Sequence, residues 1–162
     1  MNERQDRSRP ACPSCGAPGW RVPERTLRAL VRPERLARAG GAGPFRFCPV
    51  RGCPVVYFPE SAGDVLTGEA LSVTVFQKSD DPKRPVCYCF GHTVEEIERE
   101  VAATGRSAVP DSIAEKCRRG LDRCEETNPQ GRCCLGNVRA ILRAATGRLG
   151  NGDEGRESCS CD

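Results

Sequence analysis

Cysteine constrains this chain more than any other residue type, because twelve of its 162 residues are cysteines. The densest set begins with the C-x-C pair Cys87 and Cys89. Cys124 follows after a helix-sized gap, and the adjacent Cys133 and Cys134 complete the set. Thiolates that converge from two short loops are typical ligands of an iron–sulfur cluster, and the C-x-C loop places two sulfurs close enough to share one iron. The spacing predicts a cluster site, with Cys133 and Cys134 as alternatives for the fourth ligand.

Two predicted helices accompany these cysteines. Thr93 and Glu96 form a capping-box pattern at the start of a helix over 93–105, and a second apolar stripe predicts a helix over 135–145. Pro110 is expected near the start of a shorter helix between them. Helix N-termini stabilise negative charge, so helices that begin after the cysteines favour an anionic cluster.

The N-terminal half carries two further cysteine pairs, a C-x-x-C pair and a pair with four intervening residues. Two such pairs separated by a linker predict a closed, structural zinc site with four thiolates. The predicted ligands are Cys12, Cys15, Cys48 and Cys53. Gly16 and Gly52 are expected to allow the tight turns around the sulfurs.

The remaining patterns predict an α+β fold, in which a small zinc-ribbon-like β subdomain precedes a helical [2Fe–2S]-binding subdomain. Residues 55–58 and 71–76 are β-branched and aromatic and predict strands. Short helices are expected over 26–31 and, starting at a proline, over 33–39. The predicted parts are a disordered N-terminus (1–9), the zinc-binding β subdomain (10–78), a linker (79–86), the [2Fe–2S]-binding subdomain (87–146) and a disordered tail (147–162).

The motifs CYCFGHT and CEETNPQGRCCLG resemble the N-terminal domain of CopZ-type copper chaperones, whose cluster half is similar to bacterioferritin-associated ferredoxin. The resemblance covers roughly residues 12–145. It implies zinc in the first half and a [2Fe–2S] cluster in the second. The cluster ligands that it implies are Cys87, Cys89, Cys124 and Cys134.

By this resemblance, the function is electron transfer that supports reduction of Cu(II) to Cu(I), followed by copper hand-off. The implied partners are a copper carrier, a copper-exporting ATPase or a redox partner protein. Cys133, Cys159 and Cys161 are spare candidates for holding Cu⁺, which soft thiolates select. The sequence departs from full chaperones of this type, because it contains no M-x-C-x-x-C loop of a heavy-metal-associated domain.

Two other functions are compatible with parts of the sequence. The cluster pattern also fits a bacterioferritin-associated-ferredoxin-like electron carrier for iron release. Residues 21–51 contain eight arginines and only two acids, which fits a zinc-ribbon nucleic-acid binder. Few aromatic residues alternate with those arginines to stack on bases, so we expect a solvated basic face.

His92 is the only histidine and lies three residues after Cys89. A histidine ligand raises the potential of a cluster, but four cysteines complete the motif without it. We therefore expect His92 to act beside the cluster, through a hydrogen bond to sulfur or by coupling a proton to the electron.

Composition also indicates where the protein works. The N-terminal residues lack the apolar core of a signal peptide, and no run reaches the roughly 18 apolar residues of a membrane span. We expect a cytoplasmic protein, where reduced cysteines form metal sites more often than disulfides. No catalytic triad, phosphate-binding loop or carboxylate pair is evident, so we do not expect an enzyme.

Overall fold

The structure is a computed structural model that describes residues 10–41 and 43–147. It divides into two compact units. Unit 1 contains the residues up to Ser79 together with Glu125–Gly131, and unit 2 contains Asp80–Cys124 and the residues from Arg132 onward. The predicted disorder of 1–9 and of 148–162, and the copper-binding role of Cys159 and Cys161, concern residues outside the described ranges, whereas Gly147, the first residue of the predicted tail, ends helix α6. None of the described helices is long and apolar enough to cross a membrane.

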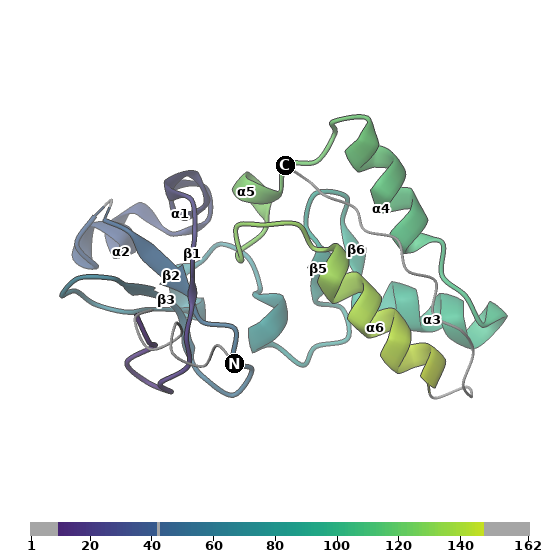
Figure 1. Cartoon of the computed structure of the whole chain (residues 1–162), viewed down its shortest axis with the longest axis horizontal. Coiled ribbons are helices and arrows are strands. Elements are labelled where there is room, and N and C mark those ends of the chain that lie inside the picture. Colours follow the sequence, from purple (N-terminus) through teal and green to yellow (C-terminus); the bar gives the residue numbers. More distant parts are fainter. Residues whose placement is uncertain (1–9, 42, 148–162) are drawn as a thin grey trace, which may run out of the picture. The chain divides into compact units, whose positions relative to one another are not determined.

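Unit 1 is built on a four-stranded antiparallel sheet in the order β1-β2-β3-β4 (Figure 1). Its strands are β1 (Trp20–Arg21), β2 (Phe45–Phe47), β3 (Val55–Pro59) and β4 (Leu66–Thr67). The strand predicted over 55–58 is confirmed as β3, in which four consecutive residues are buried. Continuous burial is typical of a strand that is covered on both faces.

The strand predicted over 71–76 is wrong. Leu71 forms a single β-bridge with Val31, and the chain then enters a short 3₁₀ helix, η3 (Phe76–Lys78); another, η2 (Gly68–Ala70), precedes it. Exposure alternates from Leu71 to Val75 as it would in a strand, but Val75 and Phe76 are both buried, and only Leu71 makes a β-bridge. A strand buries every second residue on one face. The composition therefore gave the correct burial but the wrong backbone.

Two short helices complete unit 1. They are α1 (Glu24–Leu30) and α2 (Pro33–Arg38), and the proline begins α2 as predicted. Both helices begin near the predicted positions. The core of the unit joins these helices to the sheet through buried apolar residues. They are Val22, Leu27, Val31, Ala39, Phe45, Phe47, Val56, Tyr57, Leu66, Ala70, Leu71 and Val75.

Unit 2 combines a two-stranded hairpin with helices (Figure 1). Its elements are β5 (Pro85–Cys87), β6 (His92–Thr93), α3 (Val94–Thr104), α4 (Val109–Arg118) and α6 (Leu135–Gly147). The short helix α5 (Cys124–Thr127) begins at the last residue before the chain enters unit 1. The α6 helix packs against both α3 and α4. Their facing residues are buried, namely Ile97, Val101, Val109, Ile113, Leu135 and Val138.

The ends of α3 follow the local sequence signals. The Thr93 hydroxyl accepts a hydrogen bond of 3.2 Å from the Glu96 backbone N–H, which caps the helix. Gly105 ends the helix at a φ of 77°, a left-handed conformation that favours glycine. The predicted helix over 93–105 is therefore confirmed to within one residue at each end.

Candidate metal centres

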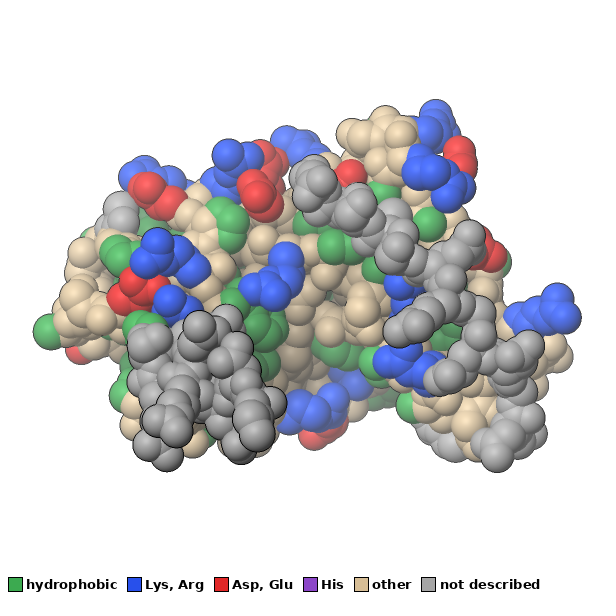
Figure 2. Space-filling model, viewed as in Figure 1, with side chains coloured by type: hydrophobic (Ala, Val, Ile, Leu, Met, Phe, Trp, Pro, Cys, Tyr) green, Lys and Arg blue, Asp and Glu red, His purple; other side chains and the backbone are tan. Residues whose placement is uncertain are grey.

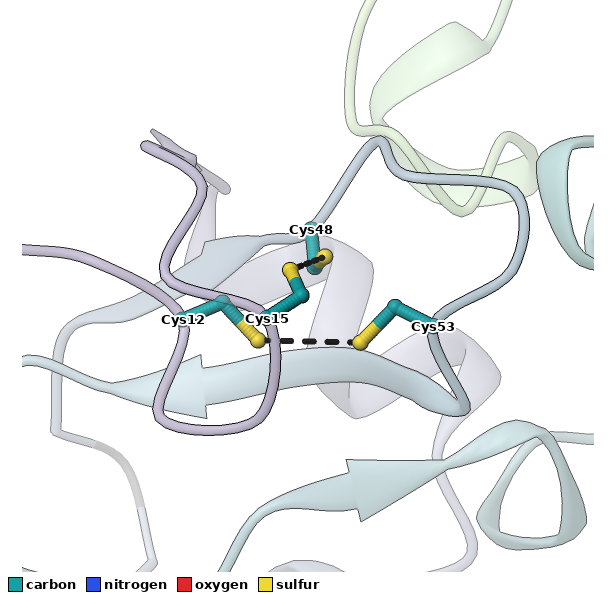
Figure 3. Close-up of side chains that lie close together, drawn as sticks. All are labelled: Cys12, Cys15, Cys48 and Cys53. Carbon is teal, nitrogen blue, oxygen red and sulfur yellow. Dashed lines mark hydrogen bonds between the residues drawn. The ribbon is translucent and has the colours of Figure 1, made fainter.

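The four cysteines predicted to bind zinc lie together at one end of the sheet of unit 1 (Figure 3). Cys12 Sγ lies 3.8 Å from Cys53 Sγ, and Cys15 Sγ lies 3.6 Å from Cys48 Sγ. All four sulfurs are within 4.8 Å of one another. A tetrahedral zinc with Zn–S bonds of about 2.3 Å separates its sulfurs by about 3.8 Å. The arrangement fits one Zn²⁺ and leaves no ligand position for water.

Two loops carry these sulfurs. The first is a tight turn in which Cys12 N–H donates to Ala17 O and Gly16 N–H donates to Cys12 O, each over 2.8 Å. Gly16 has a φ of 74° there, as its predicted role requires. The second is the connection between β2 and β3, with Cys48 directly after one strand and Cys53 shortly before the other. Pairing of the two strands therefore fixes the separation of the second cysteine pair.

The surroundings of the three buried thiols of this set, Cys12, Cys48 and Cys53, shift their pKa values. Burial raises the pKa of Cys48 to about 12, and it also raises the pKa of Cys12. At Cys53 burial is outweighed by hydrogen bonds from the Val55 backbone and from Ser14, which lower the pKa to about 7. Buried thiolates need a compensating charge, which a zinc ion provides.

In unit 2, the cysteines predicted to bind the cluster form pairs. Cys89 Sγ lies 3.5 Å from Cys124 Sγ, and the Cys87 and Cys134 side chains share a hydrogen bond. Each pair joins one cysteine of the C-x-C loop to one cysteine of the segment 124–134, which we call the second cysteine segment. We expected Cys87 and Cys89 to share one iron, whereas the structure pairs each of them with a sulfur of the other segment. Two pairs of thiolates match a two-iron cluster, in which each iron takes two protein sulfurs.

Cys133 and Cys134, the two candidates for the fourth cluster ligand, have different surroundings. Cys134 is 2% exposed, directly precedes α6 and has Cys87 as its hydrogen-bond partner. Cys133 is less buried, and its side chain contacts Cys124 instead. Cys134 thus contacts a cysteine of the C-x-C pair, whereas Cys133 contacts Cys124, and the choice of Cys134 as the fourth ligand stays a prediction. Cys117, which we expected to be a small packing residue, lies on α4 and is partly buried.

Neighbouring sulfurs dominate the ionisation of this set. A hydrogen bond with Cys87 and then burial raise the pKa of Cys134, while the same hydrogen bond lowers the pKa of Cys87. Contacts with Cys133 and Cys89 raise the pKa of Cys124. The backbone N–H of Arg123 donates to Cys89 Sγ over 3.2 Å. Like the zinc quartet, these sulfurs need a cation centre before all of them can be thiolates.

His92 lies opposite Cys87 in the hairpin register of β5 and β6. Its Nδ1 lies 3.0 Å from the Glu96 carboxylate, so the Nδ1–H form donates to that group. Its Nε2 is buried and lacks a hydrogen-bond partner within the described part of the chain. Glu96, predicted from the sequence as part of a capping box, thus also fixes the orientation of the imidazole. A carboxylate that orients a histidine is a common support for metal centres.

The arginines of residues 21–51 are partly neutralised. Figure 2 shows acidic side chains interspersed with basic ones. Arg21 and Arg46 both pair with Glu60, Arg28 pairs with Glu24, and Arg25 pairs with Glu125. Ion pairing lowers the positive potential that a nucleic-acid interface uses.

These observations define a small α+β metal-binding protein. One set of four thiols has the spacing that a zinc ion requires, and the thiols of the second set lie in pairs. Residues 9–72 match the zinc binding domain family zf_CopZ. The chain is 35% identical over 124 residues to the copper chaperone CopZ of Archaeoglobus fulgidus, over 76% of this chain and 57% of that protein. It thus spans little more than half the length of that relative.

A solved structure is also similar. The X-ray structure of the Archaeoglobus fulgidus CopZ N-terminal domain matches with a TM-score of 0.65 and 30% identity, over 82% of this chain and 97% of that one. The chain therefore belongs to the family of CopZ N-terminal domains. This result confirms the family resemblance and the mixed fold with an antiparallel sheet and several helices. The assignment of individual cysteines as ligands stays a prediction.

Proposed function

We propose that this chain is an iron–sulfur and zinc protein of copper homeostasis that transfers electrons to support reduction of Cu(II) to Cu(I). The proposal depends chiefly on the two thiol pairs of unit 2, because a structural zinc site alone supplies no redox chemistry. Membership of the CopZ family supports copper as the metal that is handled. We propose a cytoplasmic location, where these thiols stay reduced.

Cys87, Cys89, Cys124 and Cys134 would hold the cluster. When bound, a [2Fe–2S] cluster supplies one-electron transfer. The α6 N-terminus beside Cys134 and the Arg123 N–H at Cys89 both stabilise negative charge on these sulfurs. Cys12, Cys15, Cys48 and Cys53 would hold zinc in a structural role.

Reduction of one Cu(II) ion to Cu(I) consumes one electron. One electron, delivered by a redox partner protein, converts one Cu(II) into one Cu(I), and no proton or bond need be exchanged. Cu(I) prefers soft thiolates. Cys133 is a partly buried thiol that contacts Cys124 and is a candidate for holding Cu(I) before transfer to a copper carrier or a copper-exporting ATPase.

Metal analysis of anaerobically purified protein tests the cluster. We expect about two irons and about two sulfides per chain, together with one zinc, and visible absorbance that dithionite bleaches. Cys134→Ser should lose the cluster, whereas the matched neighbour Cys133→Ser should keep it. A colourless protein that also takes up no iron and sulfide on reconstitution would refute the proposal.

Stopped-flow mixing tests the copper step. Dithionite-reduced protein, freed of excess reductant, should convert Cu(II) to Cu(I) that a Cu(I)-specific chelator traps, while the Cys134→Ser protein should not. The alternative, an electron carrier for iron release, predicts instead that a deletion strain keeps its copper tolerance and accumulates stored iron. Copper sensitivity of that strain with normal iron stores would exclude this alternative.

A further inference from the structure

Residues 125–131, which separate the two ends of the cysteine segment, are bound within unit 1 although their neighbours belong to unit 2. The chain leaves unit 2 after Cys124 and returns to it at Arg132. From the sequence we expected this stretch to lie wholly within the cluster-binding subdomain. Whatever fixes residues 125–131 therefore also fixes most of the chain between Cys124 and Cys134.

Side chains of unit 1 bind the backbone of this segment at several points. The Tyr57 hydroxyl donates to Pro129 O in a buried hydrogen bond of 2.5 Å, and Trp20 Nε1–H donates to Gln130 O over 2.9 Å. The Thr26 hydroxyl donates to Glu125 O over 2.5 Å. Backbone carbonyls accept all three bonds, so any sequence in this segment would offer the same acceptors. Recognition depends on the path of the backbone and on the donors of unit 1.

The segment is also packed closely. Gly131 has a φ of 69°, and a Cβ at this position would lie 2.8 Å from Pro23 Cδ and 3.3 Å from Thr26 Oγ1. Asn128 and Gln130 are only 3% and 5% exposed. The Asn128 Oδ1 accepts from the Gln130 backbone N–H over 3.1 Å, which makes a local turn. The segment thus has one defined conformation, and unit 1 provides its surroundings.

We propose that unit 1 positions the cluster ligands through residues 125–131, with Tyr57, Thr26 and Trp20 as positioning residues. Cys124 lies one residue before the bound segment, and Cys134 lies three residues after it. Loss of the zinc unit should therefore loosen the spacing of Cys124 and Cys134 even though none of the zinc ligands belongs to their unit. The proposal rests on the proposed function in so far as it concerns a bound cluster.

The test uses the double variant Tyr57→Phe/Thr26→Val in the full chain, which removes two hydroxyl donors while keeping side-chain volume. Arg21→Gln is the matched control, because it removes an ion pair of the same unit whose partner, Glu60, lies outside the segment. All proteins are first compared in the zinc-loaded, cluster-free form. In the double variant we expect about tenfold faster hydrogen exchange at the Gln130 and Gly131 amides, since one buried and one partly buried hydrogen bond are lost. We also expect about tenfold faster alkylation of Cys124 and Cys134 by iodoacetamide.

Cluster-loaded protein provides the second comparison. The double variant should keep its zinc but lose the cluster about tenfold faster to an iron chelator, with shifted g-values in the electron paramagnetic resonance spectrum of the reduced form. A general loss of stability would instead affect the exchange of α3 amides equally. Gly131→Ala should act in the same direction through the steric clash.

The outcomes separate this proposal from the proposed function. Unchanged exchange and alkylation in the cluster-free double variant would overturn the positioning role. Faster exchange with unchanged cluster loss and an unchanged spectrum would overturn it as well. If the wild-type chain binds no cluster, the proposed function fails, and the cluster-free exchange and alkylation rates still decide whether unit 1 sets the spacing of the two cysteines.

Discussion

The two units use the same chemical group, a thiol, in two different arrangements. In unit 1 the four sulfurs converge on one point, all within 4.8 Å of one another. In unit 2 they form two pairs, with Cys89 and Cys124 3.5 Å apart and Cys87 hydrogen-bonded to Cys134. A single tetrahedral ion requires the first arrangement, and a two-iron cluster suits the second. The loops that carry cysteines, rather than their number, thus determine which metal centre a site fits.

The largest expected effect tests the single-ion site. Cys48→Ser should abolish stoichiometric zinc binding and unfold the metal end of unit 1, because structural zinc supplies about 10–16 kcal/mol of apparent binding free energy in zinc-finger peptides. Zinc analysis and thermal unfolding measure both effects. The control is Cys117→Ser, which changes a cysteine of α4 outside both predicted ligand sets. Retention of one tightly bound zinc by Cys48→Ser would contradict the four-thiolate site.

A core substitution asks whether unit 2 depends on its helices as well as on a metal. Ile97 is fully buried on α3. Ile97→Ala should destabilise the helices by about 2–5 kcal/mol, because it leaves a cavity in the core. Hydrogen exchange should show lower protection in α3 and α6, with Arg99→Ala, an exposed position of the same helix, as the control. Unchanged protection in these helices would mean that the metal ligands alone hold the unit together.

A smaller effect is expected at the cap of the same helix. Thr93→Ala removes the acceptor for the Glu96 N–H and should cost about 1 kcal/mol. Thr93→Ser keeps the hydroxyl and should restore most of the loss. Denaturant unfolding of the three proteins measures the difference. Equal stability of all three would show that the cap makes no net contribution to unit 2.

The smallest effect concerns an ion pair of unit 1. Hydrogen bonding from Arg21 and the charge of Arg46 hold the pKa of Glu60 below its ordinary value. A carboxyl with a lowered folded-state pKa stabilises the fold above its unfolded pKa of about 4.3, and this contribution disappears as the pH falls through the folded-state value. Glu60→Gln should therefore reduce stability at pH 7 by less than about 1 kcal/mol and have no effect in strong acid.

Thermal unfolding of the wild type and Glu60→Gln from pH 7 to strong acid, with zinc in excess, measures the difference in stability between the two proteins. Added salt should reduce the difference at pH 7, because the Arg21 side chain is 63% exposed. A difference between the two proteins that grows toward low pH would have the wrong sign for this ion pair.

Local signals predicted the parts of the fold that local contacts form. The cap residue Thr93 and the left-handed Gly105 directly flank the helix that they delimit, so the bounds of α3 could be predicted from the sequence. The backbone of the segment 71–76 could not, because Leu71 and Val75 are buried in the core of unit 1 without belonging to a strand. Propensity alone cannot separate these two ways of burying the same residues.

The candidate sites were predictable to a similar extent. Cysteine spacing alone indicated both sets of sulfurs. It did not reveal the pairing of Cys89 with Cys124, since that depends on how two loops meet. The contacts that hold residues 125–131 were also missed, because the Trp20–Gln130 hydrogen bond joins residues 110 positions apart. A single sequence carries no signal for a donor so distant from its acceptor.

Unit 1 is formed by two separate stretches of the chain, and this has a consequence for folding during synthesis. A ribosome releases residues up to Ser79 well before it releases Glu125–Gly131, by several seconds at about 5–20 residues per second. During that interval the donors of Trp20, Thr26 and Tyr57 have no native acceptor. The nascent N-terminal part therefore remains incomplete during this interval, and unit 1 is completed only when residues 125–131, which follow Cys124, have also been synthesised.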